Sequence, residues 1–123
     1  MAIKKYQDLK VYRLGFGLAV DVHEKTKTFP SDGRDIRCQI RRSSTSVCAL
    51  IAEGFGRRDS SAEFRRYLRM AHGSLQETKV WIEFGQALGY WPRDTAAELW
   101  RRYDELGKMI YGLSKTWTDF SHT

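Results

Sequence analysis

Apolar residues recur along this chain at spacings of three and four, which is the periodicity of amphipathic α-helices. No segment shows the strict alternation of apolar and polar residues that is typical of a half-buried strand. Glycine and proline are sparse, and they separate the periodic segments. The pattern therefore predicts four helices, at about residues 9–28, 35–54, 61–88 and 95–117.

Local signals support several of these helix ends. Asp8 can accept hydrogen bonds from the first amides of the first helix. Ser60 and Glu63 have the spacing of a capping box, which predicts the start of the third helix. Gly89 follows that helix and is expected to adopt the left-handed conformation that ends many helices.

Each predicted helix carries one apolar stripe that is expected to face a core. The stripes of the first two helices are Leu9, Tyr12, Phe16, Ala19 and Val20, and Ile36, Ile40, Ser43, Val47 and Ile51. Those of the last two are Phe64, Tyr67, Leu68, Ala71, Leu75, Thr78, Ile82 and Gly85, and Leu99, Tyr103, Leu106, Ile110, Leu113 and Trp117. Short connections allow such helices to bury their stripes most simply as an antiparallel up-and-down four-helix bundle. We therefore expect an all-α protein in which residues 1–123 form a single domain.

Four large aromatic residues lie off these stripes, namely Trp81, Phe84, Trp100 and Tyr111. Aromatic rings concentrate at protein interfaces, because a rigid ring buries a large area at little cost in entropy. We therefore predict that these four rings form a surface for self-association. The alternative is that they cover the ends of a thin bundle as partly exposed core.

Composition narrows the cellular setting. The longest stretch without a charged residue, from Ser43 to Ala52, has 10 residues, whereas about 20 apolar residues are needed to cross a bilayer. No apolar segment typical of a secretion signal follows the first residues, so we expect a cytoplasmic protein that does not enter membranes. Cys38 and Cys48 are expected to be reduced, since ten positions along one helix place them about 15 Å apart.

The net charge of +6 is distributed unevenly along the chain. Residues 34–69 contain nine arginines and four acidic residues, so this window holds +5 of the total. Clustered arginines attract polyanions and bind phosphate oxygens in a bidentate manner. We therefore predict that an RNA or DNA backbone is bound, without base-specific readout, by Arg34, Arg37, Arg41, Arg57, Arg58, Arg65, Arg66 and Arg69. The alternative is that these arginines form helix-surface ion pairs with Asp35, Asp59 and Glu63.

The sequence contains none of the common catalytic or metal-binding motifs, such as a phosphate-binding glycine-rich lysine loop, Cys-x-x-Cys, His-Glu-x-x-His or a glycine-flanked nucleophilic serine. The three histidines, His23, His72 and His122, do not have the spacing of di-iron ligands. We therefore expect no enzymatic activity, no metal and no other cofactor. His72 is expected to be a solvated or ligand-facing residue on the polar side of the third helix, which it shares with Arg65, Arg69, Gln76 and Lys79.

Glu53 and Glu77 are the carboxylates nearest the inward faces of the second and third helices. A catalytic acid–base pair would also need a nucleophile or an activated water in a cleft, and the sequence indicates neither. A buried carboxylate is tolerated only when it is paired, so Arg42 is expected to bind Glu53, Glu77 or both as a structural ion pair.

Two neighbouring segments carry a resemblance to a known family. They are residues 39–47, Gln-Ile-Arg-Arg-Ser-Ser-Thr-Ser-Val, and residues 51–58, Ile-Ala-Glu-Gly-Phe-Gly-Arg-Arg. Shorter matches follow in the family's order at residues 8–12, 29–30, 63–64, 67–68 and 71–77. Together these motifs resemble the bacterial four-helix-bundle proteins encoded in intervening sequences of 23S ribosomal RNA genes. The resemblance covers about Tyr6 to Leu113.

The resemblance implies a small bundle that commonly assembles as a homopentameric ring and has no established enzymatic activity. The family is similar to the accessory variability proteins of diversity-generating retroelements, which are basic pentamers that associate with a reverse transcriptase and nucleic acid. Two positions depart from the family pattern. Leu50 stands where the family usually has asparagine, and His72 stands where it usually has arginine.

Three functions are compatible with the sequence. The first is a non-catalytic, oligomeric protein that binds nucleic acid or acts as a scaffold, and this is the one the charge pattern favours. The second is a protein-binding adaptor that docks a partner enzyme such as a reverse transcriptase. The third and least favoured is an RNA-processing enzyme.

Overall fold

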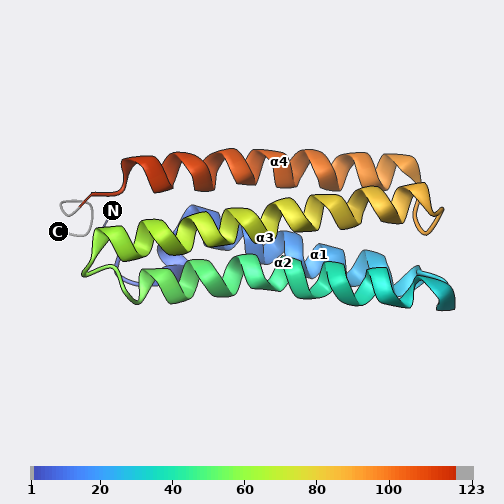
Figure 1. The fold of residues 1–123 in the computed structure, drawn as a ribbon, viewed down its shortest axis with the longest axis horizontal. Coiled ribbons are helices and arrows are strands. Elements are labelled where there is room, and N and C mark those ends of the chain that lie inside the picture. Colours follow the sequence, from blue (N-terminus) through green and yellow to red (C-terminus); the bar gives the residue numbers. More distant parts are fainter. Residues whose placement is uncertain (1, 119–123) are drawn as a thin grey trace.

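Four long helices form the bundle in the computed structural model, which describes residues 2–118 (Figure 1). The helices are α1 (Lys10–Lys25), α2 (Arg34–Phe55), α3 (Ser61–Ala87) and α4 (Arg93–Thr116), with short 3-10 turns η1 (Tyr6–Asp8), η2 (Thr26–Thr28) and η3 (Ser31–Gly33). Consecutive helices run in opposite directions, and each packs on the next, while α1 also contacts α4. No strand occurs in the described part of the chain. The predicted all-α four-helix bundle is confirmed.

The helix ends follow the local signals only in part. Ser60 accepts a hydrogen bond from the backbone amide of Glu63 at 3.2 Å, as predicted, but the Glu63 carboxylate binds Arg66 instead of reaching back. Gly89 has the expected positive φ of 77°. The helix α4 begins at Arg93, two residues before the expected start and directly after Pro92, whose backbone is extended.

The start of the first helix differs from the prediction. Asp8 does not cap α1, which begins at Lys10 after an uncapped Leu9. Its carboxylate instead accepts the backbone amides of Lys4 and Lys5 at 2.9 and 3.1 Å, and it therefore closes the preceding turn η1. These two amides also lower the pKa of Asp8, because they hydrogen-bond to its charged form.

The predicted core stripes of α2, α3 and α4 face the interior. All eight stripe residues of α3 are buried, and on the other two helices only Ile36 and Leu113 are partly exposed. The polar middle of the α2 stripe is satisfied across the helix interface. There Thr78 donates a hydrogen bond to Ser43 at 2.8 Å, and Ser46 lies 3.2 Å from Ser74.

The predicted stripe of α1 is wrong for two of its five residues, because Phe16 and Val20 are exposed. The buried apolar residues of this helix include Val11, Leu18 and Val22, which lie one residue, or about 100°, around the helix from the predicted stripe. Gly15 shares this buried face, where a Cβ would make ordinary van der Waals contacts, 3.4 Å from the Cys48 sulfur and 3.5 Å from Leu106. The face of α1 that packs against α2 and α4 is therefore the one that carries Val11, Leu18 and Val22.

A second glycine controls the contact between α2 and α3. A Cβ added at Gly54 would overlap the Cβ of Tyr67. The backbone of α2 at Gly54 therefore lies directly against the Tyr67 side chain of α3. Gly54 lies within α2, whose last helical residue is Phe55, and not at its end as the sequence suggested. None of the helices in residues 2–118 is both long enough and apolar enough to cross a membrane.

We predict opposite effects for alanine at two helical glycines. Gly54→Ala should lower the free energy of unfolding by about 1–3 kcal/mol, because the added methyl group forces α2 away from Tyr67. Gly73→Ala on the surface of α3 meets no atom within 4 Å and should raise the free energy by about 0.5–1 kcal/mol, because alanine loses less entropy in a helix. Urea denaturation measures both, and equal stabilities of the two variants would contradict the close approach.

Candidate functional site

The predicted phosphate-binding arginines fall into two groups at different ends of the bundle. Arg34, Arg37 and Arg41 lie on the first turns of α2, whereas the other five surround the connection from α2 to α3 or lie on the first turns of α3. The 22 residues of α2 separate the two groups by about 33 Å. The eight arginines therefore do not form one continuous surface.

Three of these guanidinium groups bind the carbonyl ends of helices. Their backbone partners belong to His23, Phe55 and Trp117, to which Arg41, Arg58 and Arg65 donate at 3.0, 3.0 and 2.7 Å respectively. The last carbonyls of a helix lack partners within the helix and carry partial negative charge, so a cation stabilises them. These arginines therefore contribute to the fold as well as to the surface charge.

Two more of the arginines form ion pairs, as the alternative interpretation expected. Arg66 lies 3.0 Å from Glu63, and Arg57 lies 3.6 Å from Glu53. The two other expected acidic partners, Asp35 and Asp59, make no ion pair with the described residues. Within residues 2–118, no hydrogen bond, ion pair or ring contact engages the side chains of Arg34, Arg37 and Arg69.

Arg42 binds Glu77 at 3.3 Å, which is one of the two expected partners. The pair is not buried, however, because 67% of the Arg42 side chain is exposed. Glu53 is engaged elsewhere, since it pairs with Arg57 and accepts a hydrogen bond from the Tyr67 hydroxyl at 3.1 Å. The two carboxylates are thus held in separate structural contacts.

A cationic groove runs between α3 and α4. Three cross-helix contacts define its course: Arg65 reaches the Trp117 carbonyl, the rings of His72 and Tyr111 lie 6.2 Å apart, and Lys79 binds Asp104 at 2.9 Å. Helical spacing places further polar residues on the same sides of these helices. We call this surface the α3–α4 groove, and it comprises Arg65, Arg69, His72, Gln76, Lys79, Asp104, Lys108, Tyr111 and Lys115. A cavity of about 230 Å³ opens at its centre.

The electrostatics of the α3–α4 groove depend on one shared carboxylate. Asp104 lies 2.9 Å from the Lys79 ammonium and 3.6 Å from that of Lys108. The hydrogen bond from Lys79 lowers the pKa of Asp104, so this carboxylate is ionised at neutral pH. Lys79 is only 12% exposed and also lies over the Trp100 ring at 4.1 Å, whereas Lys108 is 78% exposed. Asp104 therefore binds both ammonium groups, that of Lys79 at the shorter distance and that of the exposed Lys108 at the longer one.

Sequence reasoning identified Arg65 and Arg69 and placed His72, Gln76 and Lys79 on one polar side, but it missed Lys108 and Lys115. Lys108 closely follows Asp104 and Glu105, so a linear charge count hides it, and Lys115 lies outside the arginine-rich window of residues 34–69. In space, Glu98 and Glu105 pair with Arg101. The signal that could have found the lysines is the spacing of Asp104, Lys108, Tyr111 and Lys115 by four, three and four residues, which places them next to one another on α4.

The four predicted interface rings do not form one patch. Trp81 and Phe84 lie together on α3, with ring centroids 5.8 Å apart. Trp100 donates its ring N–H to Glu83 at 3.0 Å, and Tyr111 lies 11 residues, or about 16 Å, further along α4. Trp81 and Trp100 pack against the core as partly buried residues, which matches the alternative interpretation for these two.

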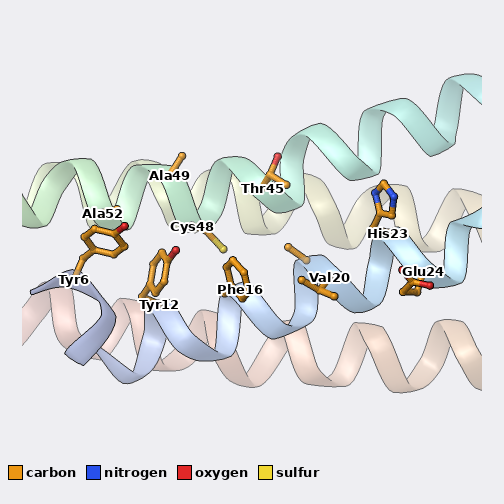
Figure 2. A pocket seen from close by; sticks show the side chains of 11 residues that line it. Tyr6, Tyr12, Phe16, Val20, His23, Glu24, Thr45, Cys48, Ala49 and Ala52 are labelled. Carbon is orange, nitrogen blue, oxygen red and sulfur yellow. The ribbon is translucent and has the colours of Figure 1, made fainter.

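A different apolar surface lies between α1 and α2 (Figure 2). Tyr12, Phe16 and Val20 of α1 point toward Cys48 and Ala49 of α2 around a cavity of about 480 Å³. Phe16 is 53% exposed there. We call this surface the α1–α2 groove, and Tyr6, Ala19, His23, Glu24, Thr45 and Ala52 complete its lining. It contains four of the residues that the sequence pattern assigned to the core, namely Tyr12, Phe16, Ala19 and Val20.

Metal ligands do not gather anywhere in residues 2–118, where no group of three or more histidine, cysteine or acidic side chains could hold an ion. His122 lies outside the described residues. Burial raises the pKa of the Cys48 thiol to about 11. This cysteine is therefore a neutral part of the α1–α2 groove at neutral pH.

Comparison with known proteins places these features in context. The model of a family described as 23S rRNA-intervening sequence proteins matches residues 7–112. The chain is also similar to the crystal structure of a protein of unknown function from the S23 ribosomal protein family of Bacteroides thetaiotaomicron, with a TM-score of 0.76 and 27% identity over 86% of this chain and 99% of that one. No curated protein matches the chain. The family resemblance seen in the sequence motifs is confirmed.

We predict that Arg42→Ala has little effect on stability. The free energy of unfolding should fall by no more than about 1 kcal/mol, because an exposed ion pair is screened by solvent. A loss of several kcal/mol in urea denaturation would show that the pair with Glu77 is effectively buried.

Proposed function

The chain belongs to the 23S rRNA-intervening sequence protein family, and on this premise we propose that it is a non-catalytic, homo-oligomeric protein that binds the phosphate backbone of RNA or DNA. The α3–α4 groove is the observation that carries this proposal. Its five cationic side chains face one carboxylate, Asp104, which is already bound to Lys79. Cations that lack acidic partners are the groups that can neutralise phosphates.

The predicted arginines contribute to this function in different ways. Arg69 continues the α3–α4 groove, and Arg34 and Arg37 offer a second, smaller cationic site at the start of α2. Arg57 and Arg66 have carboxylate partners, so they add little net positive charge to the surface. The proposed contact is to the nucleic-acid backbone, since the cations of this surface can bind the phosphates of any base sequence.

Self-association is proposed to use the α1–α2 groove rather than the four aromatic rings predicted from the sequence. Exposed apolar residues that line a groove favour burial against another protein surface. A second copy of the chain is the occupant that the family resemblance implies, and a homopentameric ring is the proposed assembly. Five copies would bring five α3–α4 grooves together, and such multivalency strengthens binding to a long polyanion.

The alternative proposal is a protein-binding adaptor. The α1–α2 groove also has the character of a site for an amphipathic helix, and a partner enzyme such as a reverse transcriptase could supply one. An RNA-processing enzyme is the least supported function, because Glu53 and Glu77 are engaged in separate structural contacts. A location in the cytoplasm, expected from the sequence, is part of the proposal.

We predict that binding of a fluorescent oligouridine weakens as the salt concentration rises. Combining Lys108→Gln with Lys115→Gln should weaken binding and reduce the slope of log affinity against log salt by about 1.4, since each lost phosphate contact on a single strand accounts for about 0.7. Fluorescence anisotropy over a salt series measures the slope. The matched control combines Lys10→Gln with Lys27→Gln, which removes the same charge from α1 and η2 and should leave the slope nearly unchanged.

Two results of this experiment would count against the proposed function. Absence of any salt-dependent binding by the unsubstituted chain would reject it. Selective capture of one protein by a chain that binds no RNA would favour the adaptor.

We predict that Phe16→Glu disrupts self-association, because it places a carboxylate inside an apolar contact. Light scattering should give several times the mass of one chain, 14.3 kDa, for the unsubstituted protein and the mass of one chain for the variant. The control, Ala62→Glu, adds the same charge to the first turn of α3 and should keep the assembly. A monomeric unsubstituted protein at micromolar concentration would exclude the oligomer.

A further inference from the structure

We propose that the α3–α4 groove binds single-stranded nucleic acid, with one unpaired base stacked on the Tyr111 ring and the flanking phosphates held by Lys108 and Lys115. This inference rests on the proposed function and specifies its substrate class. It also assigns Tyr111 to a ligand site instead of the self-association surface predicted from the sequence.

Tyr111 has the exposure and the surroundings of a stacking platform. Its side chain is 55% exposed on the rim of the α3–α4 groove. The ammonium of Lys115 lies over the ring at 5.2 Å from its centroid, and the His72 ring is tilted beside it at 6.2 Å. Proteins that bind single strands combine such exposed aromatic rings with neighbouring cations, because every base offers a face for stacking.

The position of Lys115 couples stacking of the base on Tyr111 to binding of the phosphate. Its flexible side chain covers one face of Tyr111 in the free protein, and no carboxylate among residues 2–118 pairs with it. An incoming base can replace the ammonium over the ring, and the displaced ammonium then lies next to the phosphate of that nucleotide. Stacking and charge neutralisation therefore occur at the same nucleotide.

The cavity beside Tyr111 fits one part of a polymer rather than a whole small molecule. Its volume of about 230 Å³ is below the range of about 300–1,000 Å³ found for pockets that enclose a complete ligand. Its lining combines His72 and Gln76, which can form hydrogen bonds to a base edge, with the ammonium of Lys108. Gly107 is part of the lining, and a Cβ there would lie 3.1 Å from the buried Leu75, so this glycine lets α4 pack closely on α3 beside the cavity.

The charge in the cavity is suited to one phosphate. Asp104 is held by the nearly buried Lys79, and its contact with the exposed Lys108 is longer by 0.7 Å, from 2.9 to 3.6 Å. An exposed pair of this kind contributes little stability, so Lys108 can exchange it for a phosphate at small cost. Lys79 acts here as a positioning residue, because it binds the Asp104 carboxylate.

The same geometry disfavours a duplex. The bases of a duplex are stacked on one another and paired, so none is available to the Tyr111 ring without being flipped out. A groove between two packed helices, whose axes lie about 8–10 Å apart, also admits a single extended strand more readily than a double helix. A duplex would touch only the exposed lysines on the rim.

The test compares two substitutions of Tyr111 in the full chain. Tyr111→Leu removes the ring, and Tyr111→Phe keeps it, while neither changes the charge or a buried side chain. Fluorescence anisotropy with an oligouridine and with a blunt RNA duplex of equal nucleotide number gives affinities for both forms. We expect Tyr111→Leu to weaken oligouridine binding about 5- to 150-fold, which corresponds to the loss of one stacked base, with less than about a twofold change for the duplex and an unchanged salt slope. Tyr111→Phe should bind like the unsubstituted chain.

Each outcome decides between the inference and the function on which it rests. Equal oligouridine binding by Tyr111→Leu and Tyr111→Phe, with binding still dependent on salt and on Lys108, would overturn the stacking site and leave the proposed function intact. Tighter binding of the duplex than of oligouridine by the unsubstituted chain would also overturn the inference alone. If neither probe binds, the inference and the proposed function both fail.

Discussion

The close packing of α2 on α3 is the contact on which the rest of this bundle depends. Gly54 lets α2 reach the side chain of Tyr67, and a buried hydrogen bond joins Ser43 to Thr78 where larger side chains would hold the helices apart. Because one side of α3 is committed to α2, its other side must meet α4. The polar residues of α3 that begin at Arg65 lie next to the side that packs on α4. They therefore line the α3–α4 groove.

The sequence predicted the fold well where a helix carries one apolar stripe. The stripes of α3 and α4 match the buried residues almost completely, since the pattern leaves no choice of face. On α1 two apolar stripes lie about 100° apart, and periodicity alone cannot say which one is buried. The choice is made by packing against distant parts of the chain, since the buried face around Gly15 meets Cys48 and Leu106, which lie 33 and 91 positions away.

The candidate site was predictable in its chemistry but not in its location. The density of arginines predicted a cationic site in residues 34–69. A count along the chain cannot show that Arg65 donates a hydrogen bond to the Trp117 carbonyl, 52 positions away. It also cannot show which cations of α4 are paired: Arg101 binds Glu98 and Glu105, and Lys108 lies near Asp104, whereas Lys115 has no carboxylate partner within residues 2–118. Which cations are neutralised is a property of the packed helices.

The two cysteines of α2 differ in a way that affects how the molecule can be studied. A thiol reacts with electrophiles through its thiolate, and the Cys48 thiol is both buried and held protonated by its surroundings. Cys38 is exposed on α2, which is neither of the helices that form the α3–α4 groove. The natural chain thus provides a single attachment point for a maleimide dye, so a spectroscopic reporter can be introduced without altering any residue of that groove.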